Sequence, residues 1–164
     1  LVRLAATGDE RAAKDAIFYA PSPGVSVAAL EATPPPHIDM SHMKASAAER
    51  MELESKLVPA LKERGVRILI GGDYGFPFNP NGRNARDLEI FVKHFGYTPA
   101  EALVAATKLG GELMDLPVGQ VKEGYLADLL LVDGDPTENV AILQDKNCLA
   151  MIMKDGALYK EPTA

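Results

Sequence analysis

Several features that define whole classes of protein are scarce or missing in this 164-residue sequence. Its single cysteine, Cys148, excludes an intrachain disulfide framework, and the apolar residues beside it predict a buried, inert thiol. No apolar run approaches the roughly 20 residues of a membrane-spanning helix, so we expect no membrane partner. Positive charge is also in deficit, because the formal net charge is -6. Nucleic acid is therefore not an expected partner, since phosphate binding depends on clustered Lys and Arg.

What is present is the composition of an ordinary globular protein. Hydrophobic residues make up 47% and charged residues 24%, which fits neither a disordered chain nor a membrane protein. The sequence starts at Leu1 rather than at a methionine, and its opening residues lack the pattern of a signal peptide. We therefore expect the natural chain to begin upstream of Leu1 and the protein to lie in the cytoplasm.

The N-terminal half predicts a strand, a helix and a second strand. Residues 16–20 form an apolar run before a proline-rich turn, which predicts the first strand. Helical periodicity begins at Ser46, and Gly65 is placed to end the helix in the left-handed conformation. Pro59 interrupts this helix and predicts either a kink or a second short helix. Residues 66–70, with the sequence VRILI, are typical of a strand covered on both faces, as in a parallel sheet.

Two further helices are expected in the middle of the chain. Residues 84–95 carry apolar side chains at helical spacing, and Gly96 follows as a stop signal. The sequence TPAE begins the next helix, because Thr98 can cap it and Glu101 completes a capping box. We expect this helix to run to Met114.

The C-terminal part predicts a small β unit. Residues 126–132 and 149–153 are the strongest strand candidates, and Asp155-Gly156 is a typical two-residue hairpin turn. Asp128 is expected to accept backbone hydrogen bonds within this unit. Residues 151–153 are expected to be core.

One carboxylate stands where an active site is expected. Asp73 directly follows the predicted strand at residues 66–70, at the end where barrels of parallel strands carry their catalytic groups. The neighbouring Gly72 and Gly75 let the backbone approach a ligand. On these grounds alone, Asp73 is as good a candidate for a loop-capping residue as for a functional one.

Four motifs in the second half then stand in a specific order. They are VRILIGGDYG with its strand-end Asp73, the helix start TPAEAL, the segment GQVKEGYLADL, and the terminal hairpin MIMKDGALYK. With these motifs, about residues 60–160 resemble the amidohydrolase superfamily, specifically its imidazolonepropionase-like branch.

The resemblance implies an α/β fold: the C-terminal part of a distorted (β/α)8 TIM-like barrel plus a small β-sandwich built from both chain ends. Residues 1–115 would hold strands seven and eight with the following helices, and residues 116–164 would hold sandwich strands. Asp73 would correspond to the family's strand-eight aspartate, which ligates metal and takes the proton from the attacking water. The implied cofactor is one or two divalent ions, with zinc as the first choice for its Lewis acidity without redox chemistry.

Polar residues after Asp73 are candidates for substrate binding, because they would line the rim of the site. They are Tyr74, Asn79, Arg83, Asn84 and Arg86. The alternative is a solvated loop in which Arg86 pairs with Asp87 or Glu89.

The family's other metal ligands are missing from this chain. It has no His-x-His pair, and its three histidines do not replace one: His37 and His42 lie beside a triple proline, and His94 lies on a predicted helix surface. A whole barrel takes about 250 residues, so this chain cannot close one alone.

Three hypotheses follow. The first is a piece of an enzyme that hydrolyses a carbon–nitrogen bond in a small amide, cyclic amide, urea or dipeptide-like substrate, acting as a homo-oligomer or with a partner segment that completes the barrel. The second is a non-catalytic fragment or subunit that needs such a partner. The third is a self-contained α/β binding protein.

Overall fold

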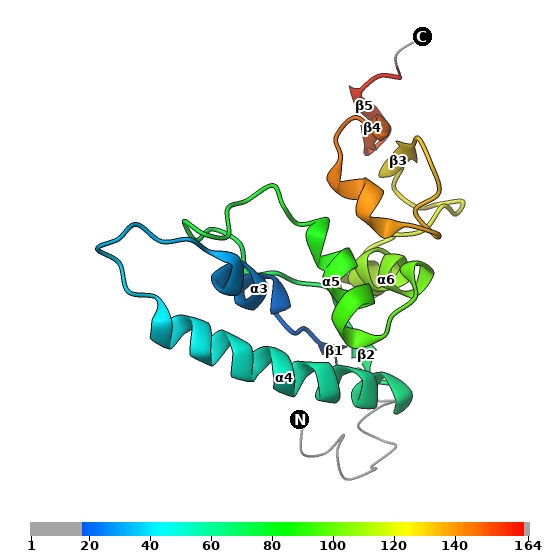
Figure 1. The fold of residues 1–164 in the computed structure, drawn as a ribbon. Coiled ribbons are helices and arrows are strands. Elements are labelled where there is room, and N and C mark those ends of the chain that lie inside the picture. The colour runs from blue at the N-terminus through cyan, green and yellow to red at the C-terminus, as the bar shows by residue number, and fades with distance from the viewer. Residues whose placement is uncertain (1–17, 163–164) are drawn as a thin grey trace.

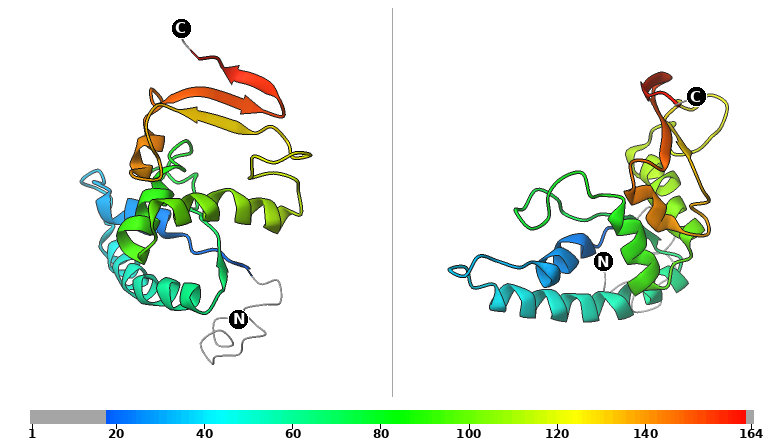
Figure 2. Two further views of the ribbon diagram at one scale, coloured as in Figure 1. Left: turned by 90° about the vertical axis from the view of Figure 1, so that its right-hand side faces the viewer. Right: turned by 45° about the horizontal axis from the view of Figure 1, so that its top comes forward.

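The computed structural model describes residues 18–162 and shows a mixed α/β fold (Figure 1). A helical body carries a short pair of parallel strands, and a separate three-stranded sheet stands at its C-terminal end (Figure 2). No helix within residues 18–162 combines the length and the apolar character needed to cross a membrane. The elements in chain order are β1 (Phe18–Tyr19), α3 (Pro23–Glu31), α4 (Ser41–Glu63), β2 (Arg67–Ile68), α5 (Arg86–Phe95), α6 (Pro99–Ala106), α7 (Lys108–Met114), β3 (Leu129–Val132), η1 (Val140–Gln144), β4 (Leu149–Lys154) and β5 (Ala157–Lys160).

The first two strands are parallel neighbours. Phe18 pairs with Arg67 and Tyr19 pairs with Ile68, and the N–H of Leu69 donates to the carbonyl oxygen of Tyr19 at 2.9 Å. Both strands lie inside the runs that the sequence indicates, although positions 16 and 17 fall outside the described residues. Because the strands are parallel, their carboxyl ends reach the same edge of the molecule.

Two helices, α3 and the long α4, lie between the two strands in the chain. The α4 helix begins at Ser41, five positions before the predicted start, and the carboxylate of Asp39 accepts the N–H of Ser41 at 2.8 Å just ahead of it. It continues through Pro59, so the prediction of a second short helix is wrong. Val58, immediately before the proline, is fully buried, and this packing compensates for the lost backbone hydrogen bond. Gly65, with φ of 75°, follows the helix end in the predicted left-handed conformation.

The core gathers where α4, α5 and α6 meet the parallel strands. Phe91 and Phe95 of α5 are completely buried. The Phe91 ring packs edge-on against Phe95 and Tyr97, with centroids 5.1 and 5.2 Å apart. The helix ends at Gly96, whose φ of 69° confirms the predicted stop. Residues that belong to this cluster are Met51, Val58, Leu61, Val66, Ile68, Leu88, Phe91, Phe95, Tyr97, Ala102, Ala105 and Val140.

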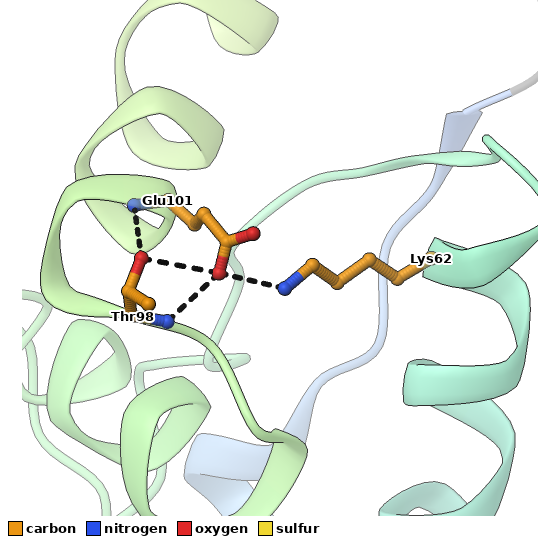
Figure 3. A network of polar contacts seen from close by, with 3 residues as sticks. All are labelled: Lys62, Thr98 and Glu101. Carbon is orange, nitrogen blue, oxygen red and sulfur yellow. Dashed lines mark hydrogen bonds and ion pairs between the residues drawn. The ribbon is translucent and has the colours of Figure 1, made fainter.

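The predicted capping box begins α6 and is tied to α4 (Figure 3). The hydroxyl of Thr98 accepts the N–H of Glu101 at 3.2 Å, and Oε2 of Glu101 accepts the N–H of Thr98 at 2.8 Å. The same Oε2 lies 2.6 Å from Nζ of Lys62. A local capping motif and a long-range ion pair therefore share one carboxylate.

The helix predicted from Thr98 to Met114 is two helices, α6 and α7, which meet at Thr107. The Thr107 hydroxyl donates to the carbonyl oxygen of Leu103 at 2.7 Å, an arrangement that bends helices. Gly119 also packs against this junction so closely that a Cβ atom there would lie 2.6 Å from the carbonyl carbon of Thr107. The break therefore comes from local bonding together with a contact that the helical pattern does not reveal.

Three antiparallel strands form the C-terminal sheet in the order β3-β4-β5. Asp155 and Gly156, with φ of 48° and 75°, make the predicted hairpin turn between β4 and β5. Oδ1 of Asp128 accepts the N–H of Asp155 at 2.7 Å, which confirms its predicted backbone role. The prediction that residues 151–153 are core is wrong, as is the prediction of a buried Cys148, because all of them are only half-buried.

Candidate functional site

Asp73 follows the carboxyl end of β2 by five positions, after the chain has left the parallel pair. Its side chain is exposed, and its backbone adopts φ of 53°, in the left-handed region. Aspartate adopts this conformation more readily than most residues other than glycine. Asp115 and Asp155 share it, at the end of α7 and in the β4–β5 turn.

Asn79 supports the backbone at Asp73. It is only 1% exposed, and its Nδ2 donates to the carbonyl oxygens of Gly72 and Asp73 at 2.9 and 3.0 Å. The main-chain carbonyl oxygen of Asn79 accepts the N–H of Gly75 at 2.9 Å. The loop of residues 74–83 thus folds back around one buried amide. In this arrangement, both hydrogens of the Asn79 amide are engaged by the backbone that carries Asp73.

The other predicted substrate-binding residues lie at different depths. Arg83 is exposed, and its carbonyl oxygen accepts the hydroxyl of the half-buried Tyr74 at 3.1 Å. Arg86 is largely buried and forms an ion pair with Glu31 at the end of α3. The alternative in which Arg86 pairs with Asp87 or Glu89 is therefore wrong, because α3 brings a closer carboxylate from a distant part of the sequence. Tyr74, Asn79 and Arg83 share one loop with Asp73, whereas Arg86 opens α5, and Asn84 is exposed before it.

A second aspartate near Asp73 was not identified from the sequence. Asp87, in the first turn of α5, is only 2% exposed. Burial raises the pKa of its carboxyl group to about 6, although the neighbouring Tyr74 side chain and the charge of Arg86 act in the opposite direction. Burial and the nearby Asp87 charge likewise raise the pKa of Tyr74. One signal was available: Asp87 stands four positions before Phe91 and shares its core-facing side of the helix.

An open cleft lies beside the loop of residues 74–83. Its volume is about 520 Å³, and its lining is mainly apolar, with Arg83 and Glu31 among the lining residues. Pro77 and Phe78 form its wall on the side of the loop, while residues 32–43 close the other side. Such a mainly apolar cleft with a few charged groups is typical of small-molecule sites.

The histidines do not join Asp73. His37 and His94 are exposed, and His42 lines a neighbouring cleft of about 390 Å³ formed by α3, α4 and the loop residues Phe76 and Phe78. Within residues 18–162, no three His, Cys, Asp or Glu side chains are grouped as metal ligands. Asp73 is therefore a single candidate ligand in the part of the chain that the structure describes.

The chain is similar to known proteins along almost its whole length. A model of the Amidohydrolase family matches residues 12–158. An ochratoxinase from Aspergillus niger is 34% identical over 102 residues, covering 60% of this chain and 20% of that protein. An imidazolonepropionase from Rubrobacter xylanophilus is 32% identical over 105 residues, covering 60% of this chain and 24% of that protein. The matched region thus spans about a fifth to a quarter of these curated relatives.

A solved structure extends the likeness to the fold. The crystal structure of the Aspergillus niger ochratoxinase aligns with a TM-score of 0.76 and 26% identity, covering 91% of this chain and 34% of that one. A prolidase crystallised with N-methylphosphonate-L-proline aligns with a TM-score of 0.75 at 21% identity, which supports the fold alone.

Proposed function

Because the chain belongs to the amidohydrolase family, we propose that it is the C-terminal part of a metal-dependent enzyme that hydrolyses a carbon–nitrogen bond. The substrate class is a small amide, cyclic amide, urea or dipeptide-like molecule. The observation that carries the proposal is the placement of Asp73: an exposed carboxylate in the loop that follows a parallel strand, on a backbone in a left-handed conformation.

Asp73 suits two tasks in such a reaction. Its free carboxylate can contribute one ligand to a divalent ion, and the same group can accept a proton from water during attack on the substrate carbonyl. The ion supplies Lewis acidity that lowers the pKa of water towards neutrality, and zinc provides this without redox chemistry. Since residues 18–162 hold no further clustered ligands, the remaining ligands come from another part of the enzyme.

The proposal also assigns parts to the two halves of the chain. Residues up to 115 would contribute the last two strands of a barrel and their helices, with β1 and β2 as strands seven and eight. Residues from 116 onward would contribute strands of a small sandwich. The length of the relatives supports a chain that is only part of such an enzyme, because the matched region covers only 20% of the ochratoxinase. The missing strands belong to the same longer protein or to a partner segment, including a second copy.

The decisive experiment replaces Asp73 by asparagine in the complete enzyme. Asparagine tolerates the left-handed backbone, so the fold should persist while turnover falls roughly 100- to 10,000-fold through loss of the proton acceptor. Asp115→Asn is the matched control, because Asp115 is also exposed and has φ of 52°, but caps the end of α7. The control should retain full activity. Near-normal turnover by Asp73→Asn would remove the proposed role.

A second candidate is a non-catalytic subunit that docks onto a partner. The exposed apolar side chains of the C-terminal sheet, among them Leu130 and Leu158, favour a chain that is covered by other polypeptide. Metal analysis of the purified 164-residue chain bears on both candidates. Stoichiometric zinc and hydrolysis by this chain alone would contradict both the partial-enzyme proposal and the subunit alternative.

A further inference from the structure

We propose that Asp87 is a positioning residue that fixes Asp73 by clamping the backbone of Gly72 against the N-terminus of α3. The inference rests on the proposed role of Asp73 as a metal ligand. It adds a function for a buried carboxylate that does not itself reach the open side of the loop.

Three segments meet around the Asp87 carboxylate. They are the first turn of α3, the end of β2 and the first turn of α5. A Cβ atom on Gly24 of α3 would lie 2.5 Å from Oδ1 of Asp87 and 2.7 Å from the Cα atom of Gly72. A Cβ atom on Gly72 would overlap Oδ2 of Asp87. Only glycine fits at these two positions, because the Asp87 carboxylate fills the space between Gly24 and Gly72.

Tyr74 and Asn79 also contact the Gly72 backbone. The Tyr74 ring lies on the same side as the Asp87 carboxylate, since the same Cβ atom would also overlap its Cε2 atom. Asn79 holds the carbonyl oxygens of Gly72 and Asp73. Asp87, Tyr74 and Asn79 together leave the residue before Asp73 no room to shift. The left-handed φ of Asp73 is thereby held by its surroundings.

An ion pair does not explain why this position holds a carboxylate. The adjacent Arg86 turns to Glu31, and Oδ1 of Asp87 has no hydrogen-bond partner among the described residues. A buried polar atom without a partner costs roughly 1–3 kcal/mol. What matters at this position is therefore the short, flat shape of the side chain, which packs between the backbones of Gly24 and Gly72. Side chains that contact a metal ligand's surroundings in this way orient the ligands of metal sites.

Shape and charge make opposite predictions, which a set of variants in the complete enzyme can separate. Asp87→Asn keeps the shape and loses the charge, whereas Asp87→Glu keeps the charge but adds a methylene to a filled space. Asp87→Ala removes both. The measurements are the affinity for Zn²⁺ in competition with a coloured chelator, the visible spectrum of the Co²⁺-loaded protein, and kcat and KM.

We expect Asp87→Asn to match the wild type in Zn²⁺ affinity, Co²⁺ spectrum and KM. Asp87→Ala and Asp87→Glu should lose roughly 10- to 100-fold in Zn²⁺ affinity, the range seen when second-layer partners of metal ligands are removed. Their kcat should fall while KM stays unchanged, because the substrate contacts remain. If Asp87→Glu is normal and Asp87→Asn is impaired, charge is the cause and the proposal is overturned. An unaltered Asp87→Ala overturns it as well.

Glu54 provides a control for burial alone. It is a second buried acid with an unpartnered oxygen, Oε2, and it lies in α4, paired with Arg50 at 3.0 Å. Glu54→Ala should lower stability but leave the Zn²⁺ affinity and the Co²⁺ spectrum unchanged. If Asp87→Ala fails to fold, the Zn²⁺ affinities of Asp87→Asn and Asp87→Glu still decide between shape and charge, because the two explanations predict opposite orders. An unaltered Zn²⁺ affinity in Asp73→Asn would instead refute the underlying metal-ligand role, whatever the Asp87 variants do.

Discussion

Residues 18–115 and residues 116–162 are built in contrasting ways. The first region holds almost every buried hydrophobic residue that the structure describes, whereas Val140 is the one that the second region contributes. The strands of the second region are half-buried or exposed on both faces. Tertiary packing therefore dominates in the region that carries Asp73, and local turn chemistry dominates in the sheet. The contrast teaches that the two regions should respond differently to the same kind of substitution.

Removing a core ring should have the largest effect. Phe91→Ala should cost about 3–5 kcal/mol, because it empties the centre of the aromatic cluster in the first region. Leu130→Ala on the exposed face of β3 should change the stability of the 164-residue chain by less than about 0.5 kcal/mol. Urea unfolding measures both. An equal loss of unfolding free energy in the two variants would contradict the contrast between the regions.

The pH dependence of stability should separate the regions next. The pKa of Asp87 is raised to about 6, above its unfolded value of roughly 3.9. Because the folded protein favours the protonated carboxyl group, the contribution of Asp87 to stability is fully present below roughly pH 3.9 and is lost as the pH rises through about 6. With metal removed by a chelator, the free energy of unfolding of the wild type should fall by about 2–3 kcal/mol relative to that of Asp87→Asn between pH 3.5 and pH 8.

The sheet contains an aspartate with the opposite behaviour. Hydrogen bonds from Thr137 lower the pKa of Asp135, so its contribution is present above the unfolded pKa and lost as the pH falls. Asp135→Asn should therefore differ from the wild type more at neutral pH than at acid pH. The same pH trend for Asp87→Asn and Asp135→Asn would show that burial does not govern the titration of Asp87.

The Asn79 side chain should matter more than a comparable asparagine in the second region. Asn79→Ala leaves the carbonyl oxygens of Gly72 and Asp73 without their donor, at a cost of roughly 1–3 kcal/mol. Asn139→Ala removes a single exposed contact, from the N–H of Ala141 to Oδ1 at 3.1 Å, and should cost at most about 1 kcal/mol. Thermal unfolding of both variants tests this order, and a larger loss in Asn139→Ala would reverse it.

Two glycine substitutions should produce the smallest effects, with opposite signs. Gly156→Ala places a Cβ atom at φ of 75° in the hairpin, which should destabilise the sheet by about 1 kcal/mol. Gly110→Ala lies within α7 and meets nothing within 4 Å, so it should stabilise by about 0.5–1 kcal/mol. Thermal melts of the two variants should therefore move in opposite directions. A melt that rises for Gly156→Ala would mean that the turn differs in solution.

The accuracy of the sequence-based predictions follows the same division between local and long-range causes. The capping box at Thr98, the stop at Gly96 and the turn at Asp155 were predicted correctly, because each depends on neighbours a few positions away. The core assignment of residues 151–153 was wrong, because an apolar strand does not reveal whether a second layer covers it. The Arg86 partner was missed because Glu31 is brought near by the folding of α3.

The family resemblance, the two parallel strands and the place of Asp73 in the loop after the second strand can be read from the sequence, since motif order and hydrophobic pattern are properties of the chain alone. The groups that hold Asp73 in place come together only in the folded molecule. Asn79 and Asp87 lie 6 and 14 positions beyond Asp73 in the sequence, and both are buried against the backbone that carries it. Gly24 reaches the same point from another helix. No short-range pattern encodes that meeting, because it depends on the packing of α3, β2 and α5 together.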